Sequence, residues 1–319
     1  MSAERPEIYD IAIIGAGGAG MTAALYGARA RRRTVVFERL MTGGQIATTE
    51  LVENYPGFPQ GINGADFAMN LVQQVERFGA ELRYEDVQTI TPRTGEPFRI
   101  ETSEGACEAH AVIATAGADY NKLGVPGESE FIGRGVSYCA TCDAAFFQDE
   151  EVVVVGGGDA AFDEALFTTR YASKVWLVHR RDTFRASALL QERVFANPKI
   201  SIIRNSVVEE ITGEDTVETA ELRDVQTGET CTLPVGAVFI FIGQTPNSHL
   251  LKGLVELDEG GHAHVDLRMR TSVPGLFVAG DLRVEAARQL VSACGDGATA
   301  ALAAEAYLAE HGIGEGEGA

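Results

Sequence analysis

Cysteine, tryptophan and long apolar runs are scarce in this chain of 319 residues. It has five cysteines and one tryptophan, and none of its apolar runs reaches the roughly 20 residues that a membrane-spanning helix requires. Basic residues are also in the minority, because 26 Lys and Arg stand against 46 Asp and Glu, for a net charge of −20. These deficits exclude a disulfide-rich scaffold and argue against a membrane span. They also argue against a nucleic-acid partner, which clustered basic side chains would bind.

The two ends of the chain are predicted from composition. No basic stretch followed by an apolar signal region precedes the first apolar strand, so we expect a cytoplasmic protein. Residues 312–319 are rich in Gly and Glu and are expected to form a flexible tail. The length between these ends is enough for two domains.

The first 40 residues carry a dinucleotide-binding fingerprint. A buried parallel strand is predicted at Ile11–Ile14, a helix at Met21–Arg31 and a second strand at Thr34–Phe37. The run Gly15-Ala-Gly-Gly-Ala-Gly20 joins the first strand to the helix. Strand, glycine run and helix in this order are typical of a Rossmann-like unit.

Each glycine of this run has its own predicted role. Gly15 permits the tight turn, Gly17 lets the backbone approach a pyrophosphate, and Gly20 lets the helix pack closely on the strand. The pyrophosphate would lie at the helix N-terminus, where free N–H groups favour anions. Glu38 lies 23 positions after Gly15, where an acidic side chain binds an adenosine ribose. The first unit therefore predicts a site for FAD or NAD.

The same pattern recurs after residue 150. Strands are predicted at Glu151–Val155 and Lys174–Val178, with a helix at Phe162–Arg170 between them. The run Gly156-Gly-Gly-Asp-Ala-Ala161 joins the first of these strands to the helix. A second nucleotide site is the interpretation that this repeat favours.

The two fingerprints carry opposite charges at matching offsets. Where the first has Glu38, the second has basic side chains that begin 23 positions after Gly156, namely His179, Arg180, Arg181 and Arg185. A carboxylate suits a free ribose 2′-hydroxyl and repels a phosphate, whereas arginines offer permanently charged, planar donors to a 2′-phosphate. The second site is therefore predicted to bind NADPH.

Only two of the five cysteines form a pattern, in the run Cys139-Ala-Thr-Cys142-Asp143. Such a pair can close a small disulfide, exchange it with an outside dithiol, or bind a metal. A structural zinc site would need a second Cys/His pair at ligand spacing, and none is present. Asp143 is a candidate proton donor for thiol exchange. The remaining cysteines are expected to be buried or inert, and they are Cys107, Cys231 and Cys294.

Other segments are predicted to complete the first domain. Residues 80–113 alternate in polarity like an antiparallel meander, and the loops Met41–Gln45 and Asn54–Phe58 are polar enough to contact a ligand. The strand Gly275–Asp281 precedes a small-residue helix that is expected to begin around Gly297. A strand ending in Asp near a helix N-terminus could bind a polyol and an electron-rich ring, which would make the first domain discontinuous.

Taken in order, these motifs resemble those of the low-molecular-weight, NADPH-dependent thioredoxin reductases of bacteria. The resemblance runs from about residue 8 to residue 310, and the Cys-Ala-Thr-Cys-Asp run before the second fingerprint is the motif specific to this family. It implies an α/β fold with two Rossmann-like, three-layer ββα dinucleotide-binding domains, the first discontinuous. The expected FAD-binding domain spans 1–119 and 248–319, and the NADPH-binding domain spans 120–247 and carries the cysteine pair.

The resemblance also implies how the parts work together. Electrons would pass from NADPH through FAD to the Cys139–Cys142 disulfide and then to oxidised thioredoxin. Cys142 would face the flavin, Cys139 would attack the thioredoxin disulfide, and Asp143 would donate and accept protons. A homodimer and a rotation of one domain against the other are implied as well. Hinges for that rotation are expected near Thr115–Ala118 and Gly243–Asn247.

The implied cofactor contacts extend beyond the glycine runs. The FAD positions are Gly15, Gly17, Gly20, Glu38, Arg39, Gly44, Gln45, Asn54, Asp281, Arg288, Gln289 and Leu290. The NADPH positions are Gly156, Gly158, Asp159, Ala160, His179, Arg180, Arg181, Arg185 and Gly243.

Other functions fit the same residues less well. A flavin-dependent dithiol oxidase or a ferredoxin-dependent reductase needs no nicotinamide site, so the basic cluster after Val178 argues against both. A related, longer type of peroxiredoxin reductase would add a thioredoxin-like extension before the first fingerprint. A nucleotide-binding sensor without catalysis would not need both cysteines and Asp143. The protein partner, thioredoxin or a glutaredoxin-like protein, is left open.

Overall fold

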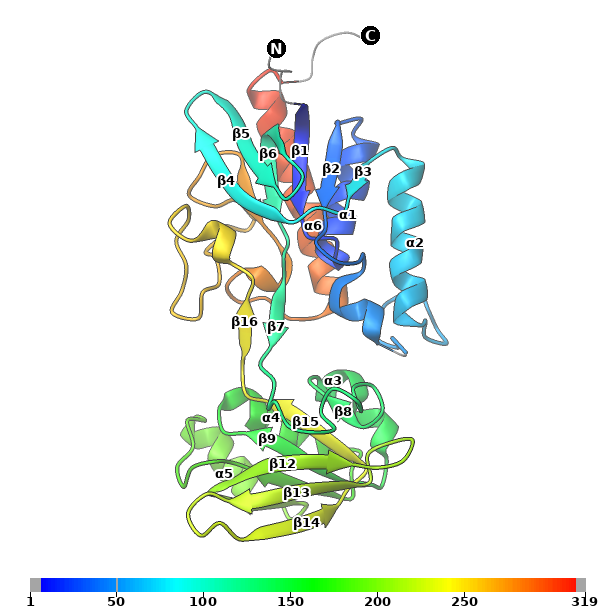
Figure 1. The fold of residues 1–319 in the computed structure, drawn as a ribbon, viewed down its shortest axis with the longest axis vertical. Helices are drawn as coiled ribbons and strands as arrows, with labels where there is room; N and C mark the ends of the chain where they lie inside the picture. Colours follow the sequence, from blue (N-terminus) through cyan, green and yellow to red (C-terminus); the bar gives the residue numbers. More distant parts are fainter. Residues whose placement is uncertain (1–6, 50, 314–319) are drawn as a thin grey trace. The chain divides into compact units, whose positions relative to one another are not determined.

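The computed structural model describes residues 7–49 and 51–313, so most of the predicted tail at 312–319 lies outside the described residues. The chain divides into two compact units, one of Met1–Asp119 with Thr245–Ala319 and one of Tyr120–Gln244 (Figure 1). The first unit is therefore discontinuous in sequence. The predicted second boundary, at 247/248, lies three residues after Gln244.

The first unit is built on a seven-stranded sheet. Its strands follow the order β3 (Glu81–Arg83), β2 (Thr34–Phe37), β1 (Ile8–Ile14), β6 (Ala106–Ala114), β5 (Glu96–Thr102) and β4 (Val87–Arg93), and β17 (Leu276–Val278) also pairs with β6. β1 is parallel to both β2 and β6, whereas β5 is antiparallel to β4 and β6. The glycine run after β1 therefore leaves the sheet at the carboxyl end of a central parallel strand, where α/β sheets bind ligands.

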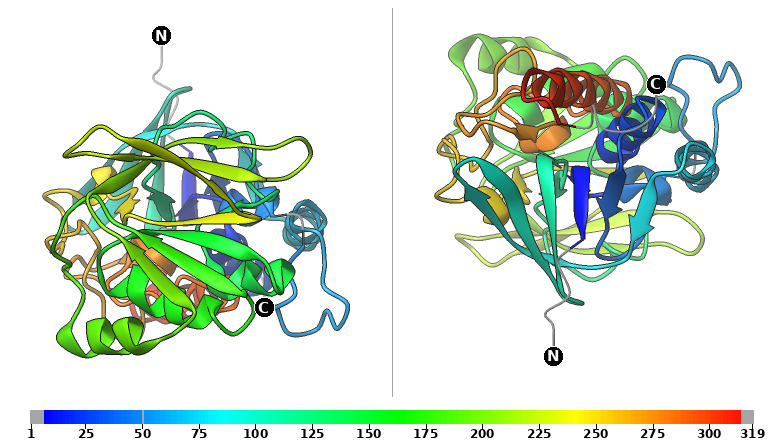
Figure 2. Two further views of the ribbon diagram at one scale, coloured as in Figure 1. Left: turned by 90° about the horizontal axis from the view of Figure 1, so that it is seen from below. Right: turned by 90° about the horizontal axis from the view of Figure 1, so that it is seen from above.

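Alternate residues of β1 face two different layers. Ile11 and Ile13 are fully buried in a core with the helices α1 (Gly18–Arg29), α2 (Gly64–Arg77) and α6 (Leu290–Glu310). Ala12 and Ile14 lie in a second core with side chains of β4 and β5. Figure 2 shows α1 and α6 side by side on one face of the sheet. Because both faces of this part of β1 are covered, its last four residues, Ile11–Ile14, form an unbroken apolar run.

Several predicted boundaries are corrected by the structure. α1 begins at Gly18 and α4 (Asp159–Thr168) at Asp159, each three residues earlier than expected. The meander predicted for residues 80–113 begins only at β4, because β3 pairs in parallel with β2. Three residues of alternating polarity cannot distinguish these two pairings, since side chains alternate in both.

The last helix shows the largest difference. α6 begins at Leu290, seven residues before the predicted start at Gly297. Gly295 and Gly297 obscure the helix in the sequence because glycine disfavours helix interiors. At Gly297 the packing explains the glycine, since a Cβ there would lie 2.0 Å from the carbonyl oxygen of Ala19 in α1.

The second unit is a three-layer ββα structure. Its five-stranded parallel sheet has the order β11 (Ile200–Ile203), β10 (Lys174–Val178), β9 (Glu151–Gly156), β15 (Ala237–Phe241) and β8 (Val136–Ser137). One face packs on α4 and α5 (Ala188–Ala196), and the other packs on the antiparallel sheet of β12 (Ser206–Thr212), β13 (Thr219–Asp224) and β14 (Thr230–Pro234), which Figure 2 shows. The predicted α/β class with two Rossmann-like units is confirmed.

The two segments that join the units pair with each other. β7 (Ala118–Tyr120) and β16 (Gln244–Pro246) form a two-stranded sheet. On one side, Asn247 N–H donates to Gly117 at 2.9 Å, and on the other Asn121 N–H donates to Gly243 at 3.1 Å. Both segments lie where hinges were predicted, and their role as hinges stays a prediction.

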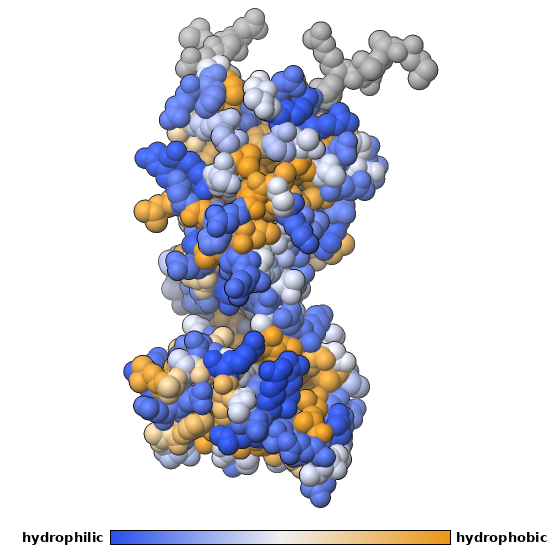
Figure 3. All heavy atoms as spheres, turned by 90° about the vertical axis from the view of Figure 1, so that its left-hand side faces the viewer, coloured by the Kyte–Doolittle hydropathy of each residue, from blue (hydrophilic) through white to orange (hydrophobic). Residues whose placement is uncertain are grey.

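The described surface is mixed in polarity, as Figure 3 shows for one face of each unit. Within 7–49 and 51–313, no helix is both long and apolar enough to cross a membrane. Cys107 and Cys294 are buried, whereas Cys231 is exposed on β14, so of the two expected alternatives, buried or inert, burial does not apply to Cys231. Cys231 is paired with Leu222 of β13 but lies on β14, an edge strand of its sheet, which leaves it accessible.

Candidate functional site

The first glycine run has three distinct local environments. Gly15 has a φ of 102°, and a Cβ there would lie 2.7 Å from the carbonyl oxygen of Thr115. A Cβ on Gly20 would lie 1.8 Å from the Gly15 oxygen, so only glycine allows this close packing. Nothing lies within 4 Å of the corresponding position on Gly17, which is also the N-cap of α1 and has no side-chain cap. Open space therefore faces the N–H groups of this helix.

Glu38 directly follows β2 and lies beside this run. Its Oε2 accepts a hydrogen bond from the Ala16 N–H and its Oε1 one from the Leu40 N–H, both at 2.9 Å. The carboxylate is thus held between the first glycine turn and its own loop, at the edge where an adenosine ribose would lie. Arg39 follows it as an exposed side chain.

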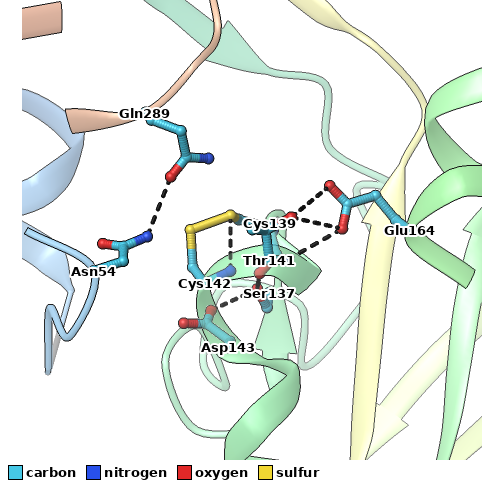
Figure 4. Close-up of a disulfide and its surroundings, with 8 residues drawn as sticks. All are labelled: Asn54, Ser137, Cys139, Thr141, Cys142, Asp143, Glu164 and Gln289. Carbon is cyan, nitrogen blue, oxygen red and sulfur yellow. Dashed lines mark hydrogen bonds between the residues drawn. A yellow bond between two sulfur atoms is a disulfide. The ribbon is translucent and has the colours of Figure 1, made fainter. Parts of the chain in front are cut away.

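The next loop approaches the same turn. Gly43 N–H donates to the Ala16 carbonyl at 2.8 Å. Gly44, the first residue of the short helix η1 (Gly44–Thr48), therefore lies beside Gly17. The Gln45 side-chain amide donates to the Ala118 carbonyl. Asn54 Nδ2 donates to Gln289 Oε1 at 3.1 Å (Figure 4), so the structure brings together two predicted positions that are 235 residues apart.

The C-terminal segment brings a second helix N-terminus to the site. Leu290, the first residue of α6, packs on α1, because a Cβ on Gly18 would lie 2.6 Å from its Cδ1. The N-cap of α6, Gln289, makes no side-chain cap bond, so α1 and α6 present two neighbouring uncapped N-termini. Asp281 lies in the short helix η4 (Gly280–Leu282), where burial raises the pKa of its carboxyl and the charge of Arg288 opposes this. Arg288 itself is exposed.

The second glycine run repeats the first. Gly158 is the N-cap of α4, without a side-chain cap, and nothing lies within 4 Å of the position of a Cβ on it. Asp159 Oδ1 accepts the Ser187 N–H at 2.6 Å, and Ala160 is exposed in the first turn of α4. Gly243, with a φ of 102°, is exposed beyond the end of β15. An anion could therefore reach the helix N-terminus here as well.

The basic residues lie in the loop that follows β10, and this loop contacts the second glycine run. Arg185 N–H donates to Gly157 at 2.8 Å, and the His179 ring lies against Gly157 with its Nε2 3.1 Å from the Thr183 carbonyl. Burial lowers the pKa of His179, so its ring is neutral at pH 7. In the described part of the chain no ion pair involves the exposed arginines of this loop, Arg180, Arg181 and Arg185.

Cys139 and Cys142 form a disulfide, with their Cα atoms 5.3 Å apart (Figure 4). Cys139 is the N-cap of the short helix α3 (Ala140–Asp143), and its Sγ accepts the Cys142 N–H at 3.2 Å. The buried side chain of Ala140 anchors this turn in the core beneath it. The spacing of the two cysteines allowed either a disulfide or a metal site, and the structure contains the disulfide. No group of three potential metal ligands lies in the described residues.

Asp143 has a partner that the sequence did not reveal. Its Oδ2 accepts a hydrogen bond from Ser137 Oγ at 2.6 Å, and the same Oγ accepts the Cys139 N–H at 3.1 Å. Burial raises the pKa of Asp143, and the bond from Ser137 opposes that shift. Ser137 ends β8, and a serine at a strand end carries no signal that could have identified it beforehand.

Glu164 of α4 is a second residue missed by the sequence analysis. Its Oε2 accepts the Thr141 N–H at 3.1 Å, and its Oε1 accepts the Thr141 hydroxyl at 3.3 Å (Figure 4). Burial raises the pKa of Glu164. The turn that holds the disulfide is thus tied to the helix that follows the second glycine run. Nothing in the sequence distinguishes Glu164 from other acidic residues on helices.

Comparison with known proteins agrees with this arrangement. The family model for pyridine nucleotide-disulphide oxidoreductases matches residues 9–302. A thioredoxin reductase of Treponema pallidum (strain Nichols) is 48% identical over 300 residues, covering 94% of this chain and 97% of that protein. One from Bacillus subtilis (strain 168) is 46% identical over 312 residues, covering 97% of both. The crystal structure of thioredoxin reductase from Streptococcus pyogenes MGAS5005 superposes with a TM-score of 0.91 at 44% identity, covering 96% of this chain and 100% of that one.

Proposed function

This chain belongs to the thioredoxin reductases within the pyridine nucleotide-disulphide oxidoreductase family, and we propose that it transfers electrons from NADPH through FAD to the Cys139–Cys142 disulfide and then to oxidised thioredoxin. Membership of this family means that the chain is an oxidoreductase acting on a disulfide, with a flavin and a pyridine nucleotide. We propose that the flavin is FAD, the pyridine nucleotide is NADPH and the disulfide substrate is thioredoxin.

The residues of the first unit fit FAD. The uncapped N-terminus of α1 behind Gly17 would bind the pyrophosphate, and Glu38 would bind the adenosine ribose. Asp281 and the N-terminus of α6 would hold the polyol and the ring. When bound, FAD supplies the two-electron chemistry that connects a nicotinamide with a disulfide.

The residues of the second unit fit NADPH. Gly158, at the uncapped N-terminus of α4, would bind its pyrophosphate. The three arginines of the loop after β10 are exposed, and no ion pair in the described part of the chain occupies them, so they are available for a 2′-phosphate. NADH lacks that phosphate, so NADPH is the proposed donor.

The cysteines then carry out thiol–disulfide exchange. Two electrons and two protons convert the Cys139–Cys142 bond to a dithiol. The Cys139 thiolate attacks one sulfur of the thioredoxin disulfide, which breaks that bond and releases the other thioredoxin sulfur as a thiolate. Cys142 next attacks the Cys139 sulfur, which restores the Cys139–Cys142 bond and releases reduced thioredoxin.

Asp143 supplies and accepts the protons of this exchange. Its carboxyl follows Cys142 directly and is largely buried, and this burial raises its pKa. A carboxyl with a raised pKa retains its proton closer to neutral pH and can pass it to a leaving thiolate. The observation that carries the proposed function is this combination, a disulfide and a buried acid in the unit that also presents the arginine loop.

We also propose that the protein is a cytoplasmic homodimer, as the family resemblance implies. Sedimentation equilibrium of the FAD-loaded protein would then give twice the chain mass of 34.0 kDa. A single species at the chain mass would contradict the dimer without affecting the proposed chemistry.

Rapid mixing of the FAD-loaded protein with NADPH or NADH tests the electron path. Flavin absorbance should bleach much faster with NADPH, and oxidised thioredoxin should then restore it. The double variant Arg180→Ala, Arg181→Ala should raise the KM for NADPH and hardly change that for NADH. Equal bleaching by both nucleotides would contradict the NADPH site. A reduced protein that reacts with oxygen but not with thioredoxin would favour a dithiol oxidase instead.

A further inference from the structure

Arg204 lies beside the predicted NADPH loop but belongs to a different strand. β10 and β11 are parallel neighbours, with Val178 opposite Ile203. The residues that follow these two, His179 and Arg204, therefore leave the sheet at adjacent positions of its carboxyl edge, on strands about 4.8 Å apart.

Backbone hydrogen bonds hold the two strand ends together. His179 N–H donates to the Ile203 carbonyl at 2.9 Å, and Ser206 N–H donates back to the His179 carbonyl at 3.0 Å. Asn205 N–H donates to the Arg181 carbonyl at 3.4 Å. Arg204 is thus fixed next to the segment that carries Arg180 and Arg181.

The Arg204 side chain lies over two aromatic rings, Phe184 of that segment and Phe195 of α5. Its guanidinium carbon is 5.2 Å from the centre of the Phe184 ring and 5.9 Å from that of Phe195. The Phe184 ring in turn lies 5.1 Å from the His179 ring. A guanidinium that contacts a ring can still donate N–H hydrogen bonds to an anion.

Among residues 7–49 and 51–313, no carboxylate forms an ion pair with this group of arginines. Arg204 is exposed, and in the described part of the chain no ion pair joins it to an acidic residue, just as for the loop arginines. Asp182 of the same loop is also outside every ion pair found there. Four arginines at one sheet edge, in a protein with a net charge of −20, repel one another unless an anion lies among them.

We propose that Arg204 is a specificity-determining residue that contacts the 2′-phosphate of NADPH together with the arginines of the β10 loop. The inference rests on the proposed NADPH site and adds to it a fourth cation from β11. Contact with Phe184 and Phe195 restricts the guanidinium before the ligand arrives, which lowers the entropy lost when it binds a phosphate.

The test compares two nucleotides that differ in the 2′-phosphate. Calorimetry would measure the binding of adenosine 2′,5′-bisphosphate and of adenosine 5′-monophosphate to the FAD-loaded protein, whose flavin site is already filled. Arg204→Ala should weaken binding of the bisphosphate by about five- to tenfold, since a hydrogen bond between charged groups at an exposed site contributes about that much to affinity. Binding of the monophosphate should be unchanged, which also shows that the variant is folded. Arg204→Lys keeps the charge but not the planar stack, so it should recover only part of the affinity.

Arg170→Ala provides the matched control. Arg170 is also exposed, belongs to the same unit and lies over a phenylalanine, with its guanidinium carbon 5.0 Å from the centre of the Phe167 ring. It follows α4 instead of a strand end, so its loss should leave the ratio of the two affinities unchanged.

Two results would overturn the role of Arg204. The first is an equal loss of affinity for both nucleotides in Arg204→Ala, which would mean contact with the adenosine instead of the phosphate. The second is no loss for either nucleotide. Failure of the wild-type protein to prefer the bisphosphate would instead contradict the NADPH site itself, so the two failures are distinguishable.

Discussion

Asp143, the proposed proton donor, and Ser137 form a hydrogen-bonded pair next to the disulfide. Two opposing influences act on the Asp143 carboxyl, since burial raises its pKa and the Ser137 hydroxyl lowers it. The same hydroxyl accepts the Cys139 N–H, so one side chain links the acid to the attacking cysteine. The acid is therefore positioned by a residue that takes no part in the exchange itself.

Asp143→Asn should slow thiol exchange by about a hundredfold, the contribution typical of a positioned acid–base group. The amide retains the shape of the carboxyl and can still accept the Ser137 bond, but it cannot release a proton. Flavin absorbance should hardly change. Turnover with thioredoxin at the wild-type rate would eliminate the acid–base role.

Ser137→Ala should change the pH dependence of the same reaction. The hydroxyl stabilises the charged carboxylate, so its loss raises the pKa of Asp143 further. Asp143 then keeps its proton to higher pH, and the pH at which the exchange rate falls as this acid ionises should move upward. The rate of thioredoxin reduction across a pH series measures the shift.

Ser137→Thr retains a hydroxyl and should restore the wild-type pH profile. The Asp143→Asn variant should lack this pH transition altogether. A lower rate in Ser137→Ala with no movement of the transition would indicate a purely structural role for the hydroxyl.

At the level of elements, the close packing of α1 and α6 builds the proposed FAD site. It places two uncapped helix N-termini side by side, at Gly18 and Leu290. Gly297 allows this approach, because a side chain there would collide with the backbone of Ala19. Gly295, two residues earlier in α6, has nothing within 4 Å of the position of a Cβ.

Substituting these two glycines should have opposite effects. Gly297→Ala should lower the free energy of unfolding by about 1–3 kcal/mol, the usual cost of overpacking, and should weaken FAD retention. Gly295→Ala should raise it by up to about 1 kcal/mol, because alanine favours a helix interior. Denaturant unfolding of the FAD-loaded variants measures both. Equal effects would show that the contact with α1 does not explain the glycine at 297.

On the scale of the whole molecule, each unit has its own cores. Those of the first unit combine β1, β6 and β17 with residues from both ends of the chain. Those of the second involve only residues within 123–242. The strands β7 and β16 pair where the chain passes between the units, which brings the two crossing points together. The first unit therefore has what it needs to fold without the second.

Deleting residues 120–244 and joining Asp119 to Thr245 through a short Gly-Ser linker should yield a folded protein that binds FAD. NADPH should no longer bleach its flavin, because the second glycine run and the arginine loop, which are proposed to bind NADPH, are gone. Circular dichroism and flavin fluorescence measure folding and binding. An unfolded product would show that the first unit depends on the second.

Much of the fold could be predicted because the informative residues are close in sequence. A strand, a glycine run and a helix occupy about 20 consecutive residues, and the turn itself requires the glycines. The beginning of α6 could not be predicted, because helix propensity opposes Gly295 and Gly297 and only contact with α1 explains Gly297. Tertiary packing overrides local preference there.

The sequence by itself determined the α/β class, the two nucleotide fingerprints with opposite charge, and the redox cysteine pair, since each depends on spacing within one segment. Tertiary structure decided which distant residues complete them. Ser137 donates a hydrogen bond to Asp143, and Glu164 accepts one from Thr141. Arg204 lies beside the arginine loop because the parallel sheet brings the ends of two separate strands to one edge. Such neighbours have no fixed separation along the chain, so no local pattern could have identified them.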